Sequence, residues 1–156
     1  RPTRRKTQIF ATNQHVLRID RETRRQISAE SFGRLAAAAE KKIEETDVVI
    51  VSDYGKGVVT PSLLARLTQA AAAAKKRVVA DPKGADFSRY AGATVLTPNK
   101  KEAGLAAGIR ITDDASMASA AKRLMGGGAV ENLLVTCGKD GMVLFEPGKA
   151  PFKIAA

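Results

Sequence analysis

Short apolar runs alternate with helix-like patterns of apolar residues from about residue 47 onward. Residues 47–52 form a β-branched run without alternation, which predicts a strand covered on both faces. Further short strands are predicted at residues 77–80, 93–96, 133–136 and 142–145, the last two joined by a turn. Strands that alternate with helices in this way predict a mostly parallel α/β sheet with flanking helices.

Capping residues mark where the helices begin. Thr60-Pro61 predicts one helix start, because a hydroxyl side chain caps well and the first helical residue does not need the N–H that proline lacks. Thr97-Pro98 predicts a second start. Asp113 or Asp114 predicts a third, and the helix that follows ends at the glycine run 126–128.

The amino-terminal part of the chain differs in kind from the rest. Residues 7–11 and 16–20 predict a polar two-stranded ribbon, and residues 31–45 carry the pattern of an amphipathic helix. Eight basic and two acidic residues lie among the first 25, so this arm carries +6 of the total net charge of +10. Such an arm suits nucleic acid, and it equally suits ATP or a phosphorylated metabolite.

Composition narrows the class of protein. The 156 residues correspond to about one domain, and 44% apolar with 27% charged residues is typical of a folded globular chain. The single cysteine excludes an internal disulfide framework and fits a reducing compartment, for which we expect the cytoplasm. No apolar run is long enough to span a membrane, and no signal peptide is recognisable. The start without Met and the abrupt end lead us to expect a piece of a longer protein.

Unusual polar residues follow four of the predicted strands, in the segments 52–57, 81–84, 97–102 and 136–141. Ligands of open α/β sheets bind beyond the carboxyl ends of the strands, so we expect these segments to share one rim. Lysines supply charge for phosphates, helix amino ends supply N–H donors, and a glutamate one turn into a helix holds Mg²⁺ through water. The combination predicts a phosphate and metal site.

Each segment alone also has an ordinary structural explanation. Asp53 could cap a helix, Asn99 and Glu102 suit the first turn of any helix, and Gly138 and Gly141 suit a hairpin. The joint occurrence at one rim favours the functional interpretation.

Other chemistries have little support in the sequence. His15 stands alone, whereas metal and catalytic sites combine several partners. Cys137 has no obvious base near it, so we expect a small buried residue and not a nucleophile. There is no Walker P-loop, no G-x-G-x-x-G motif and no Cys/His cluster.

Two motifs together point to a known family. The segment Asn99-Lys100-Lys101-Glu102 follows one predicted strand, and the segment 135–141, Val-Thr-Cys-Gly-Lys-Asp-Gly, spans the end of the next. This pair resembles the ribokinase-like (PfkB) carbohydrate kinases. Further phrases resemble the heptose 7-phosphate kinase domain of the bifunctional ADP-heptose synthases, which serve lipopolysaccharide synthesis; they lie at residues 12–20, 52–57, 81–90, 96–99 and 147–151.

The resemblance implies a ribokinase-like fold and phosphorylation of the anomeric hydroxyl of D-glycero-D-manno-heptose 7-phosphate, with ATP and Mg²⁺ as cofactors. It implies that Asn99 and Glu102 order the ATP phosphates and that Glu102 serves the metal. Thr136, Gly138 and Gly141 would line the nucleotide pocket. The substrate-binding residues implied are Asn13, Gln14, Arg18, Asp53, Lys56 and Lys83.

The resemblance also divides the chain. Residues 1–25 would be a lid-like β ribbon over the sugar, and residues 26–156 a partial α/β nucleotide-binding core truncated at both ends. The implied partners are a small sugar phosphate and ATP, without nucleic acid or membrane, and a homodimer is conceivable for the full-length protein.

Two features of the family lie outside the 156 residues. A glycine-rich sugar-binding motif would precede the ribbon, and a Gly-Ala-Gly-Asp segment carrying the catalytic base would follow Ala156. Without that base and its anion hole, phosphoryl transfer loses positioning and charge stabilisation. We therefore expect no catalytic residue in this chain and no activity from it alone.

Alternative functions remain open at the level of sequence. Another sugar or nucleoside kinase of the same superfamily is one. A basic nucleic-acid-binding module that uses the amino-terminal arm is a second, of a different class. A binding protein that has lost its chemistry but keeps the rim is a third.

Overall fold

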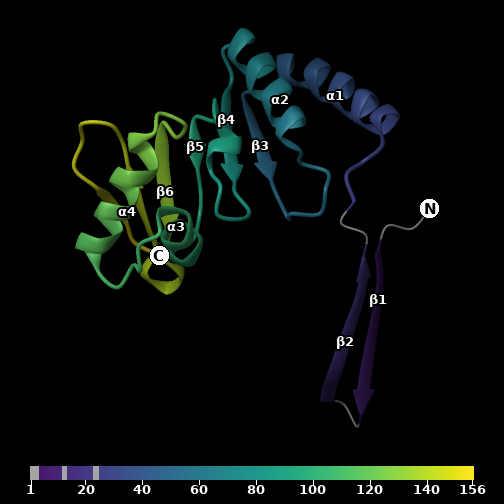
Figure 1. The fold of residues 1–156 in the computed structure, drawn as a ribbon, viewed down its shortest axis with the longest axis horizontal. Helices are drawn as coiled ribbons and strands as arrows, with labels where there is room; N and C mark the ends of the chain where they lie inside the picture. The colour runs from purple at the N-terminus through teal and green to yellow at the C-terminus, as the bar shows by residue number, and fades with distance from the viewer. Residues whose placement is uncertain (1–3, 12–13, 23–24) are drawn as a thin grey trace.

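The computed structural model describes residues 4–11, 14–22 and 25–156 (Figure 1). Two strands come first, β1 (Arg4–Ala11) and β2 (Gln14–Glu22). The remaining elements in chain order are α1 (Ala29–Glu44), β3 (Val48–Ser52), α2 (Pro61–Ala73), β4 (Arg77–Asp81), η1 (Ser88–Tyr90), β5 (Val95–Leu96), α3 (Lys100–Ala107), α4 (Asp114–Gly126), β6 (Asn132–Thr136), η2 (Gly138–Asp140), β7 (Met142–Phe145) and β8 (Phe152–Ile154).

The predicted mostly parallel sheet is confirmed. Within the described residues, β3 to β8 form a six-stranded sheet in which the strand order follows the chain order. The first four strands pair in parallel, and β7 and β8 continue the sheet in antiparallel pairing. β8, a three-residue strand that adds the last edge, has no counterpart among the predicted strands.

Alternate residues of the strands face the core. Val78, Leu96, Leu133 and Val135 are buried in one cluster with Leu64 of α2. Burial of these apolar side chains is the main favourable term in folding this layer.

The prediction that residues 47–52 are covered on both faces is wrong for this structure. Only Val51 of β3 is buried, and Ile50 is 75% exposed. The strand lies at the edge of the sheet, and no described element covers the face that carries Val48 and Ile50.

The helices begin at side-chain caps. The Thr60 hydroxyl accepts the N–H of Leu63 and confirms the predicted start of α2, and Asp113 caps α4. The predicted start at Thr97-Pro98 is two residues early. Asn99 is the cap of α3, because its side chain accepts an N–H of the first helical turn.

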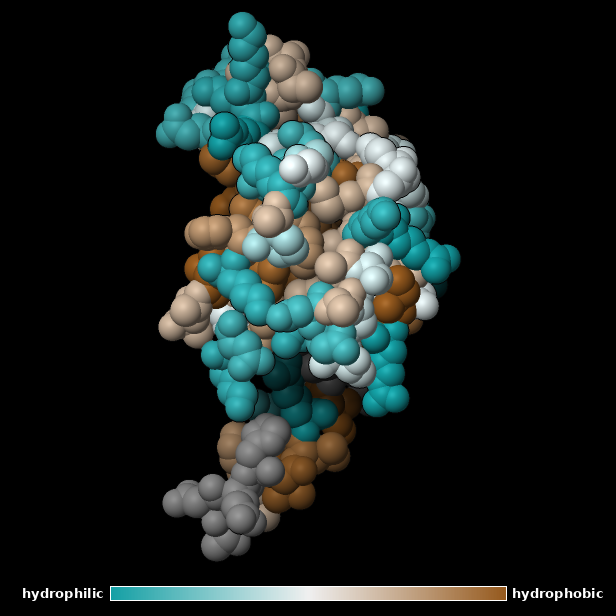
Figure 2. Space-filling view, turned by 90° about the vertical axis from the view of Figure 1, so that its left-hand side faces the viewer, coloured by the Kyte–Doolittle hydropathy of each residue, from teal (hydrophilic) through white to brown (hydrophobic). Residues whose placement is uncertain are grey.

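The predicted amino-terminal ribbon is present, and most of its residues are polar, but one of its faces carries apolar side chains. β1 and β2 pair in antiparallel fashion and extend away from the six-stranded sheet (Figure 1). Ile9 lies opposite Leu17, and Thr7 lies opposite Ile19, so alternation along the strands places three large apolar side chains on one face. All three are exposed. In the lower part of Figure 2, hydrophobic residues gather at the surface of the ribbon.

Among the described residues, no helix has both the length and the apolar character needed to cross a membrane.

Candidate functional site

The carboxyl ends of β3 to β6 form one rim, as the sequence analysis expects. The N–H of Asp53 donates to the carbonyl of Asp81 at 3.1 Å, so the chain leaving β3 stays beside the chain leaving β4. Farther along, Asn99 forms a parallel bridge with Thr136. The parallel pairing thus brings together four segments that are far apart in the sequence.

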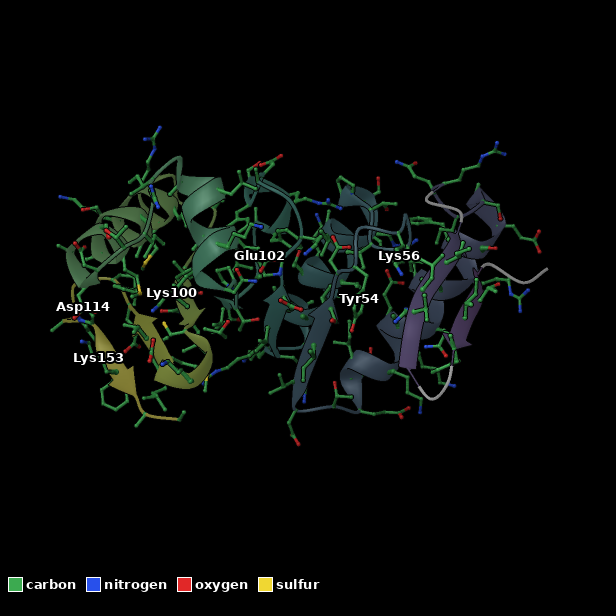
Figure 3. The ribbon with its side chains drawn as sticks, turned by 90° about the horizontal axis from the view of Figure 1, so that it is seen from below. Tyr54, Lys56, Lys100, Glu102, Asp114 and Lys153 are labelled. Carbon is green, nitrogen blue, oxygen red and sulfur yellow. The ribbon has the colours of Figure 1, made fainter. Side chains whose placement is uncertain are left out.

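Figure 3 looks onto this rim from below. From the side of the ribbon, the labelled residues follow one another as Lys56, Tyr54, Glu102 and Lys100. Lys56 lies in the loop after β3, on the side nearer the ribbon, whereas Glu102 and Lys100 belong to the first turn of α3.

Asn99 and Glu102 form a reciprocal capping box at the amino end of α3. The N–H of Glu102 donates to Asn99 Oδ1 at 2.9 Å, and the N–H of Asn99 donates to Glu102 Oε2 at 3.2 Å. The two side chains are therefore held in fixed positions at a helix amino end, where N–H groups and the helix dipole favour anions.

Lys83 joins this helix start from the loop after β4. Its Nζ lies 2.9 Å from Glu102 Oε1, and the hydrogen bond and charge of Glu102 raise the pKa of the Lys83 ammonium. Both oxygens of Glu102 thus have partners, one the backbone of Asn99 and the other Lys83.

Asp81 adds a further carboxylate to the rim. Its pKa is raised, and although the residue as a whole is exposed, partial loss of hydration of the carboxylate is the largest cause. The negative charges of Glu102 and Asp53 raise it further, while Lys83 lowers it. The rim therefore concentrates negative charge around one lysine, which favours a cation there.

Asp53 is held inside the protein by hydrogen bonds to both of its carboxylate oxygens. It is 4% exposed, and its Oδ1 accepts the N–H of Gly55 at 2.7 Å. Its Oδ2 accepts the hydroxyl of Tyr90 at 2.7 Å and lies 3.5 Å from Nη2 of Arg89. The geometry thus gives Asp53 the position of a loop anchor.

Tyr90 and Arg89 were not among the site residues predicted from the sequence. Tyr90 is fully buried, and its hydroxyl also accepts the N–H of Lys83 at 2.8 Å. Arg89 donates to the carbonyl of Val59 at 2.6 Å. Neither residue lies at a strand end or in a periodic pattern. The only signal was that both belong to the phrase 81–90 that carries the family resemblance.

The turn after β6 lies beside the start of α3. The N–H of Thr136 donates to the carbonyl of Pro98 at 2.9 Å, and Nζ of Lys100 lies 3.5 Å from Asp140 Oδ2. Gly141 closes the turn with φ +83°, and a Cβ there would overlap the carbonyl of Ile154. Gly141 is therefore required by the hairpin itself, whatever it contributes to a ligand.

Cys137 begins this turn and is only partly buried, packed against the core. The expectation of a buried residue therefore holds in part.

The ribbon residues are not brought together with the rim. Asn13 and the side chain of Gln14 lie outside what the structure describes. Arg18 is exposed on β2, opposite Gln8, in the ribbon that extends away from the sheet (Figure 1). Lys56 is half-buried in the loop after β3.

The residues of the rim fit a magnesium ion that arrives with a nucleotide. Among the residues that the structure describes, no three His, Cys, Asp or Glu side chains are grouped so that they could hold a metal ion by themselves. Mg²⁺ is usually bound by one or two carboxylates together with water and substrate phosphates. Glu102 and Asp81 are such a pair, and the negative charge of Glu102 helps to raise the pKa of Asp81.

One cavity of the described part lies away from the rim. It has a volume of about 630 Å³ and lies between α4 and the connection from β7 to β8, with Met125, Val130 and Phe145 among its lining residues. Val130 precedes β6 and Phe145 ends the antiparallel β7, so this cavity is at the amino end of β6, opposite the rim.

Comparison with known proteins finds a matching family model and several similar proteins. A model of the pfkB family carbohydrate kinases matches residues 3–156. Bifunctional protein HldE from Desulfatibacillum aliphaticivorans is 48% identical over 156 residues, which is 100% of this chain and 32% of that protein. HldE from Wolinella succinogenes is 45% identical over 146 residues, 94% of this chain and 31% of that protein. The chain thus spans about a third of the length of these curated relatives.

Solved structures share the fold. Ribokinase from Arabidopsis thaliana, complexed with ribose and ATP, superposes with a TM-score of 0.66 at 15% identity, over 89% of this chain and 44% of that one. Phosphofructokinase-2 from Escherichia coli, in complex with potassium, gives a TM-score of 0.65 at 18% identity, over 83% and 42% of the two chains. With the family match over almost its whole length and this ribokinase-like fold, the chain belongs to the pfkB family of carbohydrate kinases.

Proposed function

We propose that these residues are part of an ATP-dependent kinase that phosphorylates the anomeric hydroxyl of D-glycero-D-manno-heptose 7-phosphate. The observation that carries the proposal is the start of α3, where one capping box fixes Asn99 and Glu102 while Lys83 pairs with Glu102. The identity to HldE proteins and the heptose-kinase-like phrases of the sequence support this choice of sugar.

In this proposal, the residues of the rim have different roles. Mg²⁺, when bound with ATP, neutralises charge on the phosphates. Glu102 would hold the metal through water, and Asn99, which fixes Glu102, would present the helix amino end to the phosphates. Thr136, Gly138 and Gly141 line the nucleotide pocket. Lys83, which pairs with Glu102, would also meet a phosphate group.

The sugar side of the site is proposed from the ribbon and the loop after β3. Asn13, Gln14 and Arg18 would lie over the sugar when the ribbon acts as a lid, and Lys56 would meet the 7-phosphate. Asp53 would contribute by anchoring the loop that carries Lys56. Residues 1–25 and 26–156 would then be lid and core. We place the enzyme in the cytoplasm. Its partners would be a sugar phosphate and ATP, without nucleic acid. The full-length protein would be able to form a homodimer.

A direct assay tests the proposal. The full-length natural protein is incubated with ATP, Mg²⁺ and heptose 7-phosphate, with ribose, fructose 6-phosphate and a nucleoside as competing acceptors. We expect ADP release and a new anomeric phosphate with the heptose only. Turnover of another acceptor would identify a different kinase of the family, and binding of random DNA at physiological salt without any kinase activity would favour the nucleic-acid module.

Two variants locate the site. Glu102→Gln removes the metal carboxylate, and we expect a loss of activity of about 100-fold or more with a raised Mg²⁺ requirement. Glu40→Gln is the matched control, since it also removes a carboxylate from an ion pair, that with Arg66, which joins α1 to α2. Equal effects of the two variants would contradict the assignment of Glu102. That the 156-residue polypeptide alone is inactive stays a prediction, which the same assay tests.

A further inference from the structure

A buried hydrogen-bond chain connects the loops that follow β3 and β4. The N–H of Lys83 donates to the Tyr90 hydroxyl at 2.8 Å, and that hydroxyl donates to Asp53 Oδ2 at 2.7 Å. The other oxygen of Asp53 accepts the N–H of Gly55 at 2.7 Å. One tyrosine hydroxyl thus joins the backbone of the second loop to the carboxylate that shapes the first.

Arg89 encloses this chain from the side. Its guanidinium lies over the Tyr90 ring, 5.4 Å from the centroid, and 3.5 Å from Asp53 Oδ2. It also donates to the carbonyl of Val59, near the end of the loop after β3. Asp53 and Tyr90 are buried, so water does not compete for the hydrogen bond between them.

The hydrogen-bond chain ends at the backbone N–H of Lys83. From the position that Tyr90 fixes, the Lys83 side chain crosses to Glu102 of α3. Gly55 keeps this route clear, because a Cβ at residue 55 would lie 3.3 Å from Cγ of Lys83. The ion pair itself is half-exposed at Lys83 and would be poorly oriented without a fixed backbone.

We propose that Tyr90 is a positioning residue that acts through Lys83: its buried hydroxyl fixes the Lys83 backbone against Asp53, so that the ammonium is directed to Glu102 and to the phosphate that meets it. The inference rests on the proposed kinase function. It deepens that function by adding a residue which touches neither nucleotide nor sugar. Asp53 and Arg89 belong to the same positioning unit.

The first part of the proposal, that the Tyr90 hydroxyl fixes the Lys83 backbone, is tested without substrate. Tyr90→Phe keeps the ring and its edge contact with Phe87 but removes the hydroxyl. In the full-length protein we expect the Lys83 amide to exchange its hydrogen at least about tenfold faster, with the amide of buried Leu133 unchanged. An unchanged rate at Lys83 would overturn the proposal. If Tyr90→Phe does not fold, Asp53→Asn is measured in the same way.

The second part, that Tyr90 acts through Lys83, is tested by a double-mutant cycle on kcat/KM for sugar phosphorylation. Tyr90→Phe should lower kcat/KM about tenfold when Lys83 is present and leave it nearly unchanged in a Lys83→Met background, because residues of one network are not additive. Thr68→Val is the matched control, since Thr68 has a buried hydroxyl that bonds only within α2. Its effect should be equal in both backgrounds.

Failure of this inference and failure of the proposed kinase function would give different results. Equal losses from Tyr90→Phe with and without Lys83 would show a merely structural role and overturn the inference, while leaving the kinase intact. Absence of kinase activity in the unmodified full-length protein would instead overturn the proposed function, and the exchange rate of the Lys83 amide would still decide whether Tyr90 fixes that backbone.

Discussion

The Nζ of Lys83 and the Oε1 of Glu102 lie 2.9 Å apart and connect the loop after β4 to the first turn of α3. An ion pair with one half-exposed partner adds little to stability. Its value lies in orientation, because the same carboxylate also closes the capping box with Asn99. Helix start, lysine and carboxylate are thereby prearranged for a charged ligand before it arrives.

The first prediction separates capping from binding at Asn99. Asn99→Ala should cost about 1 kcal/mol of stability through the lost cap, and should weaken the binding of Mg²⁺ and ADP about tenfold or more. Asp113→Ala removes the equivalent capping box of α4 and should leave nucleotide affinity unchanged. Thermal unfolding and calorimetric titration with ADP measure both quantities. Equal nucleotide affinities in the two variants would remove Asn99 from the site.

The second prediction concerns the turn that closes at Gly141. Gly141→Ala should destabilise the protein by more than 2 kcal/mol, about twice the usual cost of a positive φ, because its Cβ would also overlap the carbonyl of Ile154. Gly148→Ala is the control: φ is +71° and no atom lies within 4 Å of the added Cβ, so about 1 kcal/mol is expected. Denaturant unfolding compares them, and similar losses would show that the turn adapts freely.

A third prediction follows from the ionisation of Tyr90. Burial, aided by the hydrogen bond to Asp53, raises the pKa of Tyr90 from 10.0 to about 12. Between these pH values the folded protein keeps a proton that the unfolded chain releases, so stability must fall as pH rises through this window. Tyr90→Phe lacks this contribution and should show a shallower loss between pH 10 and 12. At pH 7 the variant should be about 1–3 kcal/mol less stable, since the buried Asp53 carboxylate and the part-buried N–H of Lys83 each lose a partner.

Unfolding curves of both proteins across that pH range provide the measurement. Parallel pH dependences would mean that the Tyr90 hydroxyl is not shielded as the structure shows.

The fourth prediction tests the core beneath the rim. Leu64 of α2 is 1% exposed, and Leu64→Ala should cost about 3 kcal/mol through lost burial and a residual cavity. Leu105→Ala, on the surface of α3, replaces a side chain that is 64% exposed and should change stability by no more than about 0.5 kcal/mol. The difference between their unfolding midpoints reports the packing of α2 on the sheet.

The sequence was sufficient where a local rule decides the structure. Thr60-Pro61 begins α2, Asp113 caps α4, and the strands with their shared rim follow from apolar runs that end in polar residues. It placed the start of α3 too early, because Thr97-Pro98 carries the same signal as Thr60-Pro61. Only the capping box shows that Asn99 is the cap.

Features that depend on the tertiary arrangement could not be predicted in this way. An apolar run such as residues 47–52 looks the same whether or not a second layer covers it, and here Ile50 is exposed. Whether Asp53 faces a ligand or a buried tyrosine depends on Tyr90, which is 37 positions away in the chain. No periodicity connects such a pair.

The strand order of the six-stranded sheet bears on how this chain acquires its structure during synthesis. Each strand from β4 to β8 pairs with the strand that precedes it in the sequence. A growing polypeptide can therefore add every new strand to a partner that has already left the ribosome, without waiting for distant segments. Pairing in chain order thus limits the time during which a strand edge stays unpaired.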